Sequence, residues 1–371
     1  MDRRHLAVTL AFLGAVLGGP PRPAEARQFE IPTAEEYAER AAKAEAAPLF
    51  QSHDPIRITL TTDIEWLVDE RNDSVEVDGT ATFVDLDGSE VTRPVQVRAR
   101  GNFRRDRKNC NFPPLRLDFP TGQMEGTVFE GQDKLKLVTP CNDGRDAYQN
   151  YVFDEYLAYR AFQTVTPYSF RVRPVEITYV DVEDDYRTRT KHAFLIEDEV
   201  AMAERNGATM VEATQFHPLR MDGPHAVTVA MFNYMIANSD WSPVYFHNSK
   251  LIRLEDGRHL TVPYDFDWSG IVNPRYATPD PKLNIRNVRQ RVYRGFCRPE
   301  LTYDTAVGVF RETREAIRDL YEGFAALGYA DFDADDARDA LRYLEDFYEV
   351  VDDPDEFEDE IVENCRSTET G

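Results

Sequence analysis

Hydrophobic side chains alternate with polar ones along the first half of this 371-residue chain, and they recur at helical spacing along much of the second half. Alternation is typical of strands that are buried on one face, whereas a repeat of three to four residues is typical of amphipathic or buried helices. We therefore expect an α+β fold. A strand-rich part with mostly antiparallel strands and one inserted helix, residues 56–200, precedes a mostly helical part, residues 201–351, and polar motifs near the junction suggest a cleft between the two.

The same patterns place the individual segments. Strands are expected at 56–60, 75–77, 80–83, 91–100, 115–119, 135–138, 172–179 and 192–196. Helices are expected at 148–164, 225–237, 303–327 and 335–351. A hairpin is expected to join 251–254 to 259–262 through the Asp256-Gly257 turn.

Both ends of the chain differ from this central part. A basic start, an apolar run at 6–17 and the sequence Ala24-Glu-Ala predict a signal peptide over residues 1–26, with a retained N-terminal anchor as the alternative. Residues 27–55 indicate an arm or a short helix, and residues 352–371 an acidic tail. No later segment is apolar enough to span a bilayer, so we expect an exported protein that is periplasmic, on the cell surface or extracellular.

The chain is strongly acidic, with a formal net charge of −24. Phosphate groups would be repelled by such a surface, so a nucleic acid or an anionic membrane is not expected as a partner. Adaptation to a salty habitat would explain the same acidity, and composition does not distinguish these reasons.

Four cysteines follow the leader, and none forms a Cys-x-x-Cys pair that would indicate a zinc site. In an exported chain an even number of cysteines suggests disulfides, and four allow three connectivities. We predict Cys110–Cys141 and Cys297–Cys365, the second tying down the C-terminal tail. Free buried thiols are the alternative.

The most informative motif lies in the second half, where Asn238-Ser-Asp240 is followed by His247-Asn248 and by Tyr264-Asp265-Phe-Asp267. A buried helix ends before Asp240, and the expected hairpin starts at Asn248 and ends at Asp265. An amide and a carboxylate oxygen, from Asn248 and Asp265, suit Mg²⁺, which also retains waters and phosphate oxygens. Asp240 could then accept a proton from an attacking hydroxyl. Ordinary turn and capping chemistry is the alternative for each residue alone.

A second motif, Arg100-Gly101-Asn102 with further arginines on both sides, follows an expected strand. Glycine allows the backbone to approach a phosphate closely, and guanidinium groups pair with phosphate oxygens. A solvated hairpin turn is the alternative for this motif.

The third motif is the strand Lys134-Leu-Lys136, followed by Glu155 in the expected helix. Only seven lysines accompany 36 arginines, so two lysines on one strand face suggest a requirement for an ammonium group. Protein kinases hold nucleotide phosphates with a strand lysine paired to a helix glutamate. A solvent-facing strand edge would also use lysine.

Together these motifs resemble the CotH family, the spore-coat protein H kinases and their bacterial relatives, and more distantly the HipA-type kinases. The likeness covers roughly residues 90–295, in the family's order. It implies a two-lobed protein-kinase-like fold, with a strand-rich N-lobe, a helical C-lobe and a cleft between them. It also implies binding of ATP with Mg²⁺ or Mn²⁺ and transfer of phosphate to a protein acceptor.

By position, the resemblance gives Asp240 the role of catalytic base and makes Asn248 and Asp265 the metal ligands, with Asp267 competing for the metal. The gap from Asp240 to Asn248 exceeds the usual kinase spacing, and an insertion at 242–246 would absorb it.

The resemblance also assigns the nucleotide-binding residues. Lys136, or less so Lys134, would hold the phosphates with Glu155 orienting it, and the turn at 100–102 would cover the triphosphate. A hinge that contacts adenine would begin at Glu197.

Two other functions remain open at this point. A family member could have kept the fold as an inactive, pseudokinase-like envelope scaffold. An envelope binding module could instead use Trp241, Trp268 and neighbouring acids to contact carbohydrate or Ca²⁺.

Overall fold

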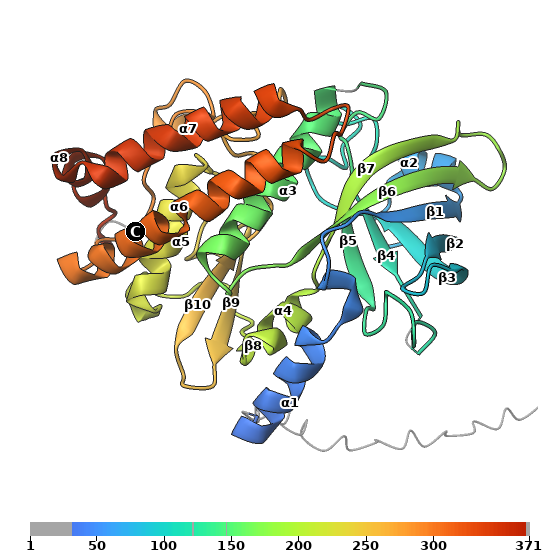
Figure 1. Ribbon diagram of the computed structural model, residues 1–371, viewed down its shortest axis with the longest axis horizontal. Coiled ribbons are helices and arrows are strands. Elements are labelled where there is room, and N and C mark those ends of the chain that lie inside the picture. Colours follow the sequence, from blue (N-terminus) through green and yellow to red (C-terminus); the bar gives the residue numbers. More distant parts are fainter. Residues whose placement is uncertain (1–31, 121, 146, 369–371) are drawn as a thin grey trace, which may run out of the picture.

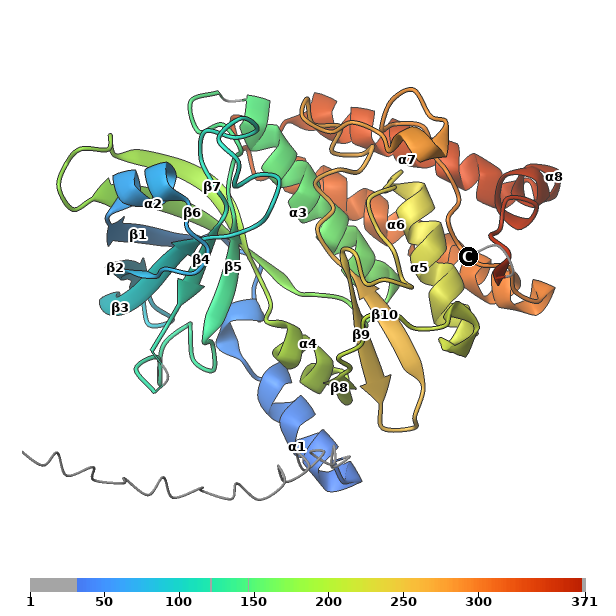
Figure 2. The ribbon, with the colours of Figure 1, turned by 180° about the vertical axis from the view of Figure 1, so that it is seen from behind.

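The computed structural model describes residues 32–120, 122–145 and 147–368. The predicted signal peptide, residues 1–26, lies outside the described residues, as do 27–31 of the expected arm and 369–371 of the tail. The chain forms a barrel of strands on one side and a group of long helices on the other, and these two parts are seen side by side in Figures 1 and 2.

The barrel consists of seven strands in the order β1-β2-β3-β4-β5-β7-β6, which closes on itself. Their bounds are β1 Ile56–Thr62, β2 Val77–Val84, β3 Glu90–Ala99, β4 Leu115–Asp118, β5 Lys134–Val138, β6 Val172–Asp181 and β7 Arg189–Ile196. Each of these strands coincides with or overlaps a strand expected from alternation.

Closure of the barrel depends on β1, which pairs with β2 on one side and with β6 on the other. The β1–β6 pairing is parallel, from Ile56 opposite Val175 to Thr62 opposite Asp181. The prediction of a two-lobed kinase-like fold, with an antiparallel strand-rich lobe, a helical lobe and a cleft, is therefore wrong. Strand alternation reports which face of a strand is buried, but it carries no information about which distant strand closes the sheet.

The barrel interior is filled by the alternating apolar residues of its strands. In β1, for example, Ile56, Ile58 and Leu60 are buried while Arg57 points outward. Phenylalanines complete this core, including Phe83 of β2 and the loop residue Phe129. The barrel is thus a packed scaffold. Its inward side chains form the core, and its outward side chains face solvent or the rest of the molecule.

The second part of the molecule combines helices with a three-stranded sheet. Its long helices are α3 Ala147–Val165, α5 Gly223–Met235, α6 Glu300–Ala325 and α7 Ala334–Asp352, and its sheet is β8 Ala208–Met210, β9 Ser249–Leu254 and β10 His259–Pro263, in the order β10-β9-β8. The expected helices and the expected hairpin are present. Helices α3, α5 and α7 each pack on α6, and together with the hairpin they share one hydrophobic core.

Shorter elements connect or flank these two parts. They are α1 Ala34–Glu45, α2 Ile64–Glu70, α4 Glu199–Arg205 and α8 Pro354–Phe357, with short turns of 3-10 or π-helix. Helix α1 packs against α4, which leads from the barrel to β8 (Figure 1).

The two predicted disulfides, Cys110–Cys141 and Cys297–Cys365, are confirmed. The first closes the long loop after β3 onto the segment after β5, and the second joins the C-terminal segment to the chain before α6. Disulfides fit a protein that folds in an oxidising compartment. Within the described ranges, no helix has both the length and the apolar character needed to cross a membrane.

Candidate functional site

The loop after α5 positions Asp240. Ala237 has a left-handed backbone (φ 50°), which ends the helix. The buried Asn238 then donates a hydrogen bond from Nδ2 to Oδ1 of Asn233 (2.9 Å) and accepts one from the backbone N–H of Asp240 (3.1 Å). The asparagine pair therefore fixes the backbone from which the Asp240 carboxylate projects.

A short loop returns the chain from Asp240 to Asn248. The backbone N–H of Ser242 donates to the carbonyl of His247 (2.9 Å), so the residues between them form a closed turn. Asn248 Nδ2 then lies 2.8 Å from the carbonyl oxygen and 3.1 Å from Oδ2 of Asp240. The closed turn at 242–247 thus lets Asn248 contact Asp240 although eight positions separate them.

His247 contacts the other oxygen of the same carboxylate, with its Nε2 2.9 Å from Asp240 Oδ1. This hydrogen bond is the main reason why the pKa of His247 is raised. Asp240 thus has one neighbour on each carboxylate oxygen, and its side chain remains 38% exposed. It is a restrained carboxylate that solvent can reach.

Asp265 follows β10 and lies beside Asn248, because the ends of the hairpin face each other. The backbone N–H of Tyr264 donates to the carbonyl of Asn248 (3.0 Å), and that of Asp265 donates to the hydroxyl of Tyr159 on α3 (2.8 Å). Both Asn248 (φ 48°) and Asp265 (φ 65°) have left-handed backbones. Asn and Asp adopt this conformation more readily than other residues apart from glycine, and here it turns the chain at both ends of the hairpin.

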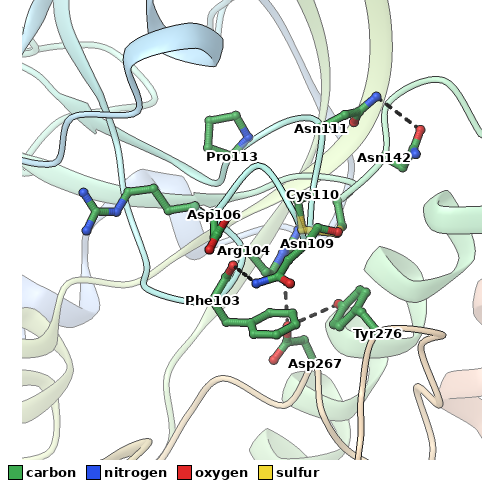
Figure 3. Close-up of a disulfide and its surroundings, with 12 residues drawn as sticks. Phe103, Arg104, Asp106, Asn109, Cys110, Asn111, Pro113, Asn142, Asp267 and Tyr276 are labelled. Carbon is green, nitrogen blue, oxygen red and sulfur yellow. Dashed lines mark hydrogen bonds and ion pairs between the residues drawn. A yellow bond between two sulfur atoms is a disulfide. The ribbon is translucent and has the colours of Figure 1, made fainter.

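A buried charge cluster adjoins Asp265. Figure 3 shows Arg104, in the loop held by the Cys110–Cys141 disulfide, beside Asp267, with Nη1 4.0 Å from Asp267 Oδ2. The same Nη1 lies 3.9 Å from Glu155 Oε2. Tyr276 donates a hydrogen bond to Asp267 Oδ2 (3.2 Å). Burial, and then the charge of Asp265, raises the pKa of Asp267 to about 7.

Glu155 is fully enclosed in the same cluster. Burial, followed by the charges of Asp267 and Asp265, raises its pKa well above the ordinary value. Within the described part of the chain, Glu155 Oε1 and Arg104 Nε have no hydrogen-bond partner. Two carboxyl groups thus share one arginine, and the charge of Asp265 adds to the acidic surroundings.

Lys136 of β5 approaches the site from the barrel. Its Nζ lies 4.6 Å from the ring centroid of Tyr264, the residue before Asp265. Burial, and then the nearby charge of Arg100, lowers the pKa of Lys136 to about 8. Lys250 of β9 lies over the same ring (5.7 Å). Its Nζ is paired with Glu199 Oε2 (2.6 Å), so Lys136 and Arg100 are the basic groups available to an anion here.

The other nucleotide-binding candidates do not join this cluster. Lys134 pairs with Asp118 (3.7 Å) and Asp133 (3.6 Å). Glu197 is buried, and its Oε1 forms ion pairs with Arg171 (2.9 Å) and Arg205 (3.0 Å). Its side chain is thus committed to holding the structure.

Within the Arg100-Gly101-Asn102 turn, only Arg100 has an effect on the residues of the site. Arg100 acts electrostatically on Lys136 and Glu155, whereas Gly101 (φ 84°) and Asn102 are exposed. Glu155 forms its ion pair with Arg104 and not with Lys136. Arg104 was missed as a site residue, and the signal that could have found it is its position six residues before Cys110, in a loop that the disulfide anchors.

The protein itself offers few ligands for a divalent metal at this site. Across the residues that the structure describes, no group of three or more His, Cys, Asp or Glu side chains is placed to hold a metal ion. Asn248 and Asp265 offer two adjoining oxygen donors, and the surplus of carboxylates around Asp267 favours a cation. This donor set fits Mg²⁺ or Mn²⁺ bound together with phosphate oxygens and water, but not a closed protein cage.

Replacement of Lys136 by methionine should show how much the buried ammonium group lowers the free energy of unfolding. Because the folded-state pKa of about 8 lies below the ordinary 10.5, the unfolded chain binds more protons between these pH values, and stability should rise with pH across this range. Lys136→Met removes the penalty and should stabilise the protein by on the order of 2 kcal/mol at pH 7, with the gain shrinking toward pH 10. Urea unfolding at several pH values would measure it.

The matched control is Lys282→Met, which removes an exposed ammonium in the turn Pro281–Leu283. It should leave the pH dependence of unfolding unchanged. A stability difference between wild type and Lys136→Met that is constant from pH 7 to pH 10 would contradict the assignment.

No family model matches the chain, and no curated protein matches it.

Proposed function

We propose that this chain is a CotH-like, metal-dependent phosphotransferase that moves the γ-phosphate of ATP to a hydroxyl group of a protein acceptor. The observation that carries the proposal is the direct contact of Asp240 with Asn248, which starts the hairpin whose other end leads into Asp265. The proposal depends on this site and on the sequence resemblance, and it does not depend on a kinase-like fold.

Each acidic residue has a distinct role in the proposal. Asn248 and Asp265, with Asp267 behind them, would hold Mg²⁺ or Mn²⁺, which when bound neutralises charge on the phosphate oxygens. The acceptor oxygen bonds to the γ-phosphorus as the bond from that phosphorus to the β,γ-bridging oxygen breaks and ADP leaves. The acceptor's proton passes to Asp240, which His247 and Asn248 hold in place.

The basic residues would hold the nucleotide. Lys136 and Arg100 lie beside Asp265 and would pair with the phosphates. Arg104 is held between Glu155 and Asp267, so it would brace these acids and limit their mutual repulsion. The two disulfides fit action outside the cytoplasm, in the periplasm, on the cell surface or in the medium.

The carbohydrate-binding alternative loses its main support. Trp241 is 3% exposed and cannot present its ring to a sugar. Trp268 packs edge-on against Phe103, with ring centroids 5.0 Å apart. An inactive, nucleotide-binding scaffold remains distinguishable by experiment, because it would bind ATP and transfer nothing.

The test is calorimetric titration of ATP in Mg²⁺, in Mn²⁺ and in EDTA. Wild type should bind with either metal and lose most of its affinity in EDTA. Asp265→Asn should weaken metal-dependent binding by on the order of 10- to 100-fold, because a charged metal ligand is lost. The control Asp319→Asn, on an exposed position of α6, should match wild type. Absence of nucleotide binding in wild type with either metal would overturn the proposal.

A further inference from the structure

The stretch between β10 and α6 that covers residues 273–298, the basic segment, has a charge opposite to that of the whole protein. It contains seven basic side chains and one acidic side chain, in a chain of net charge −24. The basic residues are Arg275, Lys282, Arg286, Arg289, Arg291, Arg294 and Arg298. Such a local excess of positive charge is typical of a surface that contacts an anionic partner.

Few of these cations are neutralised by the protein itself. Within the described residues, only Arg291 has a carboxylate within 4.0 Å, at 3.8 Å from Asp346. Arg289 and Arg298 contact an aromatic ring and a backbone carbonyl. The neighbouring helices α6 and α7 differ, because all five of their arginines form ion pairs. The exposed and unpaired side chains of the basic segment are those of Arg275, Lys282 and Arg286.

Both ends of the basic segment are attached to the candidate site. Near its start, the Tyr276 hydroxyl donates a hydrogen bond to Asp267 Oδ2 (3.2 Å). Near its end, Arg294 Nη1 donates to the carbonyl oxygen of Ser239, the residue before Asp240. The basic segment therefore connects the two acidic parts of the site, and Arg294 brings a guanidinium group next to the proposed base.

The C-terminal segment adds one more cation close to Arg294. Phe296 and Arg366 form a parallel bridge, in which the backbone N–H of Arg366 donates to the carbonyl of Gly295 (2.8 Å). The adjoining Cys297–Cys365 disulfide holds this pairing in place. The guanidinium of Arg366 lies over the Phe296 ring, 4.6 Å from its centroid, and no described carboxylate lies within 4.0 Å of it.

The bridged strands lie against the loop that carries the proposed base. One small cavity is lined both by Trp241, the residue after Asp240, and by Phe296. Because Arg294 precedes Phe296 and Arg366 stacks on its ring, both guanidinium groups border the surface on which the Asp240 side chain is 38% exposed. An acceptor that reaches Asp240 would therefore meet these two cations.

We propose that Arg294 and Arg366, with the rest of the basic segment, bind an acidic stretch of polypeptide that carries the acceptor hydroxyl. Guanidinium groups pair with carboxylates through parallel hydrogen bonds in one plane. A short acidic stretch needs only this local surface, whereas a long nucleic acid would also be repelled by the net charge of −24. Transfer to such an acceptor rests on the proposed phosphotransferase function, but binding of the acidic stretch does not.

The experiment presents two fluorescent heptapeptides to the full chain at constant ionic strength. Each has a central serine, which is flanked by glutamates in one peptide and by glutamines in the other. Fluorescence anisotropy without ATP measures binding, and labelled ATP with Mg²⁺ measures transfer. The glutamate peptide should bind about tenfold more tightly than the glutamine peptide, and it should be the better acceptor. Arg294→Gln and Arg366→Gln should each weaken binding of the glutamate peptide by about three- to tenfold.

The controls separate charge from loop structure. Arg294 also holds the Ser239 carbonyl, so Arg294→Lys, which keeps the charge, should retain most of the affinity. Arg366→Gln removes a side chain whose contact is a ring stack, and Arg342→Gln removes the same charge from an exposed position of α7 and should bind as wild type does.

Equal affinity for the two peptides would overturn the proposal, as would unchanged affinity for the glutamate peptide in both Arg294→Gln and Arg366→Gln. Tighter binding of a thymidine oligonucleotide of the same charge would assign the surface to nucleic acid and overturn it too. Preferred transfer to the glutamine peptide would overturn this proposal and leave the phosphotransferase function standing. Binding of the glutamate peptide that both variants weaken, without any transfer, would support the surface and count against the phosphotransferase function alone.

Discussion

Asp240→Asn should abolish most phosphate transfer while leaving nucleotide binding nearly intact. The substitution keeps the size of the side chain but removes its capacity to take a proton, and loss of a general base commonly costs 10²- to 10⁴-fold in rate. Asp240 is not among the proposed metal ligands, so metal-dependent ATP affinity should change by less than about threefold, or roughly 0.6 kcal/mol. Single-turnover autophosphorylation with labelled ATP, beside calorimetric ATP binding, measures both quantities on one preparation.

Two comparisons make this result specific to Asp240. Asp319→Asn changes the same functional group on an exposed face of α6 and should transfer phosphate at the wild-type rate. Asp240→Ala additionally deletes the acceptors for His247 and Asn248, so its folded loop should be less restrained. Phosphate transfer at the wild-type rate in both Asp240 variants would exclude Asp240 as the base. If the wild-type protein itself binds ATP and transfers no phosphate, it is an inactive scaffold.

Local features of this chain were predictable because they depend on neighbouring residues. Alternation gave the barrel strands, and helical spacing gave the buried helix α5 and the hairpin that follows it. The approach of Asp240 to Asn248 was also predictable, since the hairpin geometry limits where the chain can return. The cysteine pairing, one of three possible connectivities, was predicted correctly, although the sequence alone did not exclude the others or free thiols.

Features that depend on distant partners were not predictable from one sequence. Nothing in the β1 sequence distinguishes an edge strand from one that pairs in parallel with β6 more than 100 positions later, as Ile56 does with Val175. Arg104 competes with Lys136 for Glu155, and only the loop anchored by Cys110 decides between them. The sequence shows which cations could pair with Glu155, but only the folded structure shows which of them lies within reach of it.

Phe266 connects the stability of the helical part to the geometry of the site, and Phe266→Ala should affect both. Its side chain is fully buried, with its ring centroid 4.7 Å from that of Tyr159, whose hydroxyl also accepts the backbone N–H of Asp265. The deletion should lower the free energy of unfolding by about 3–5 kcal/mol, the usual cost of such a cavity. Because Asp265 and Asp267 flank this anchor, ATP affinity of the folded variant should also fall, by about tenfold, or 1.4 kcal/mol.

The matched control is Phe129→Ala, which removes an equally buried ring from the barrel core. It should cost a similar free energy of unfolding, measured in urea, and leave ATP affinity unchanged at a temperature where both variants are folded. Equal losses of affinity in the two variants would mean that binding tracks global stability. A loss of ATP affinity in Phe266→Ala alone would mean that packing of the helical core keeps Asp265 and Asp267 in position. The site would then be positioned by packing as much as by its polar contacts.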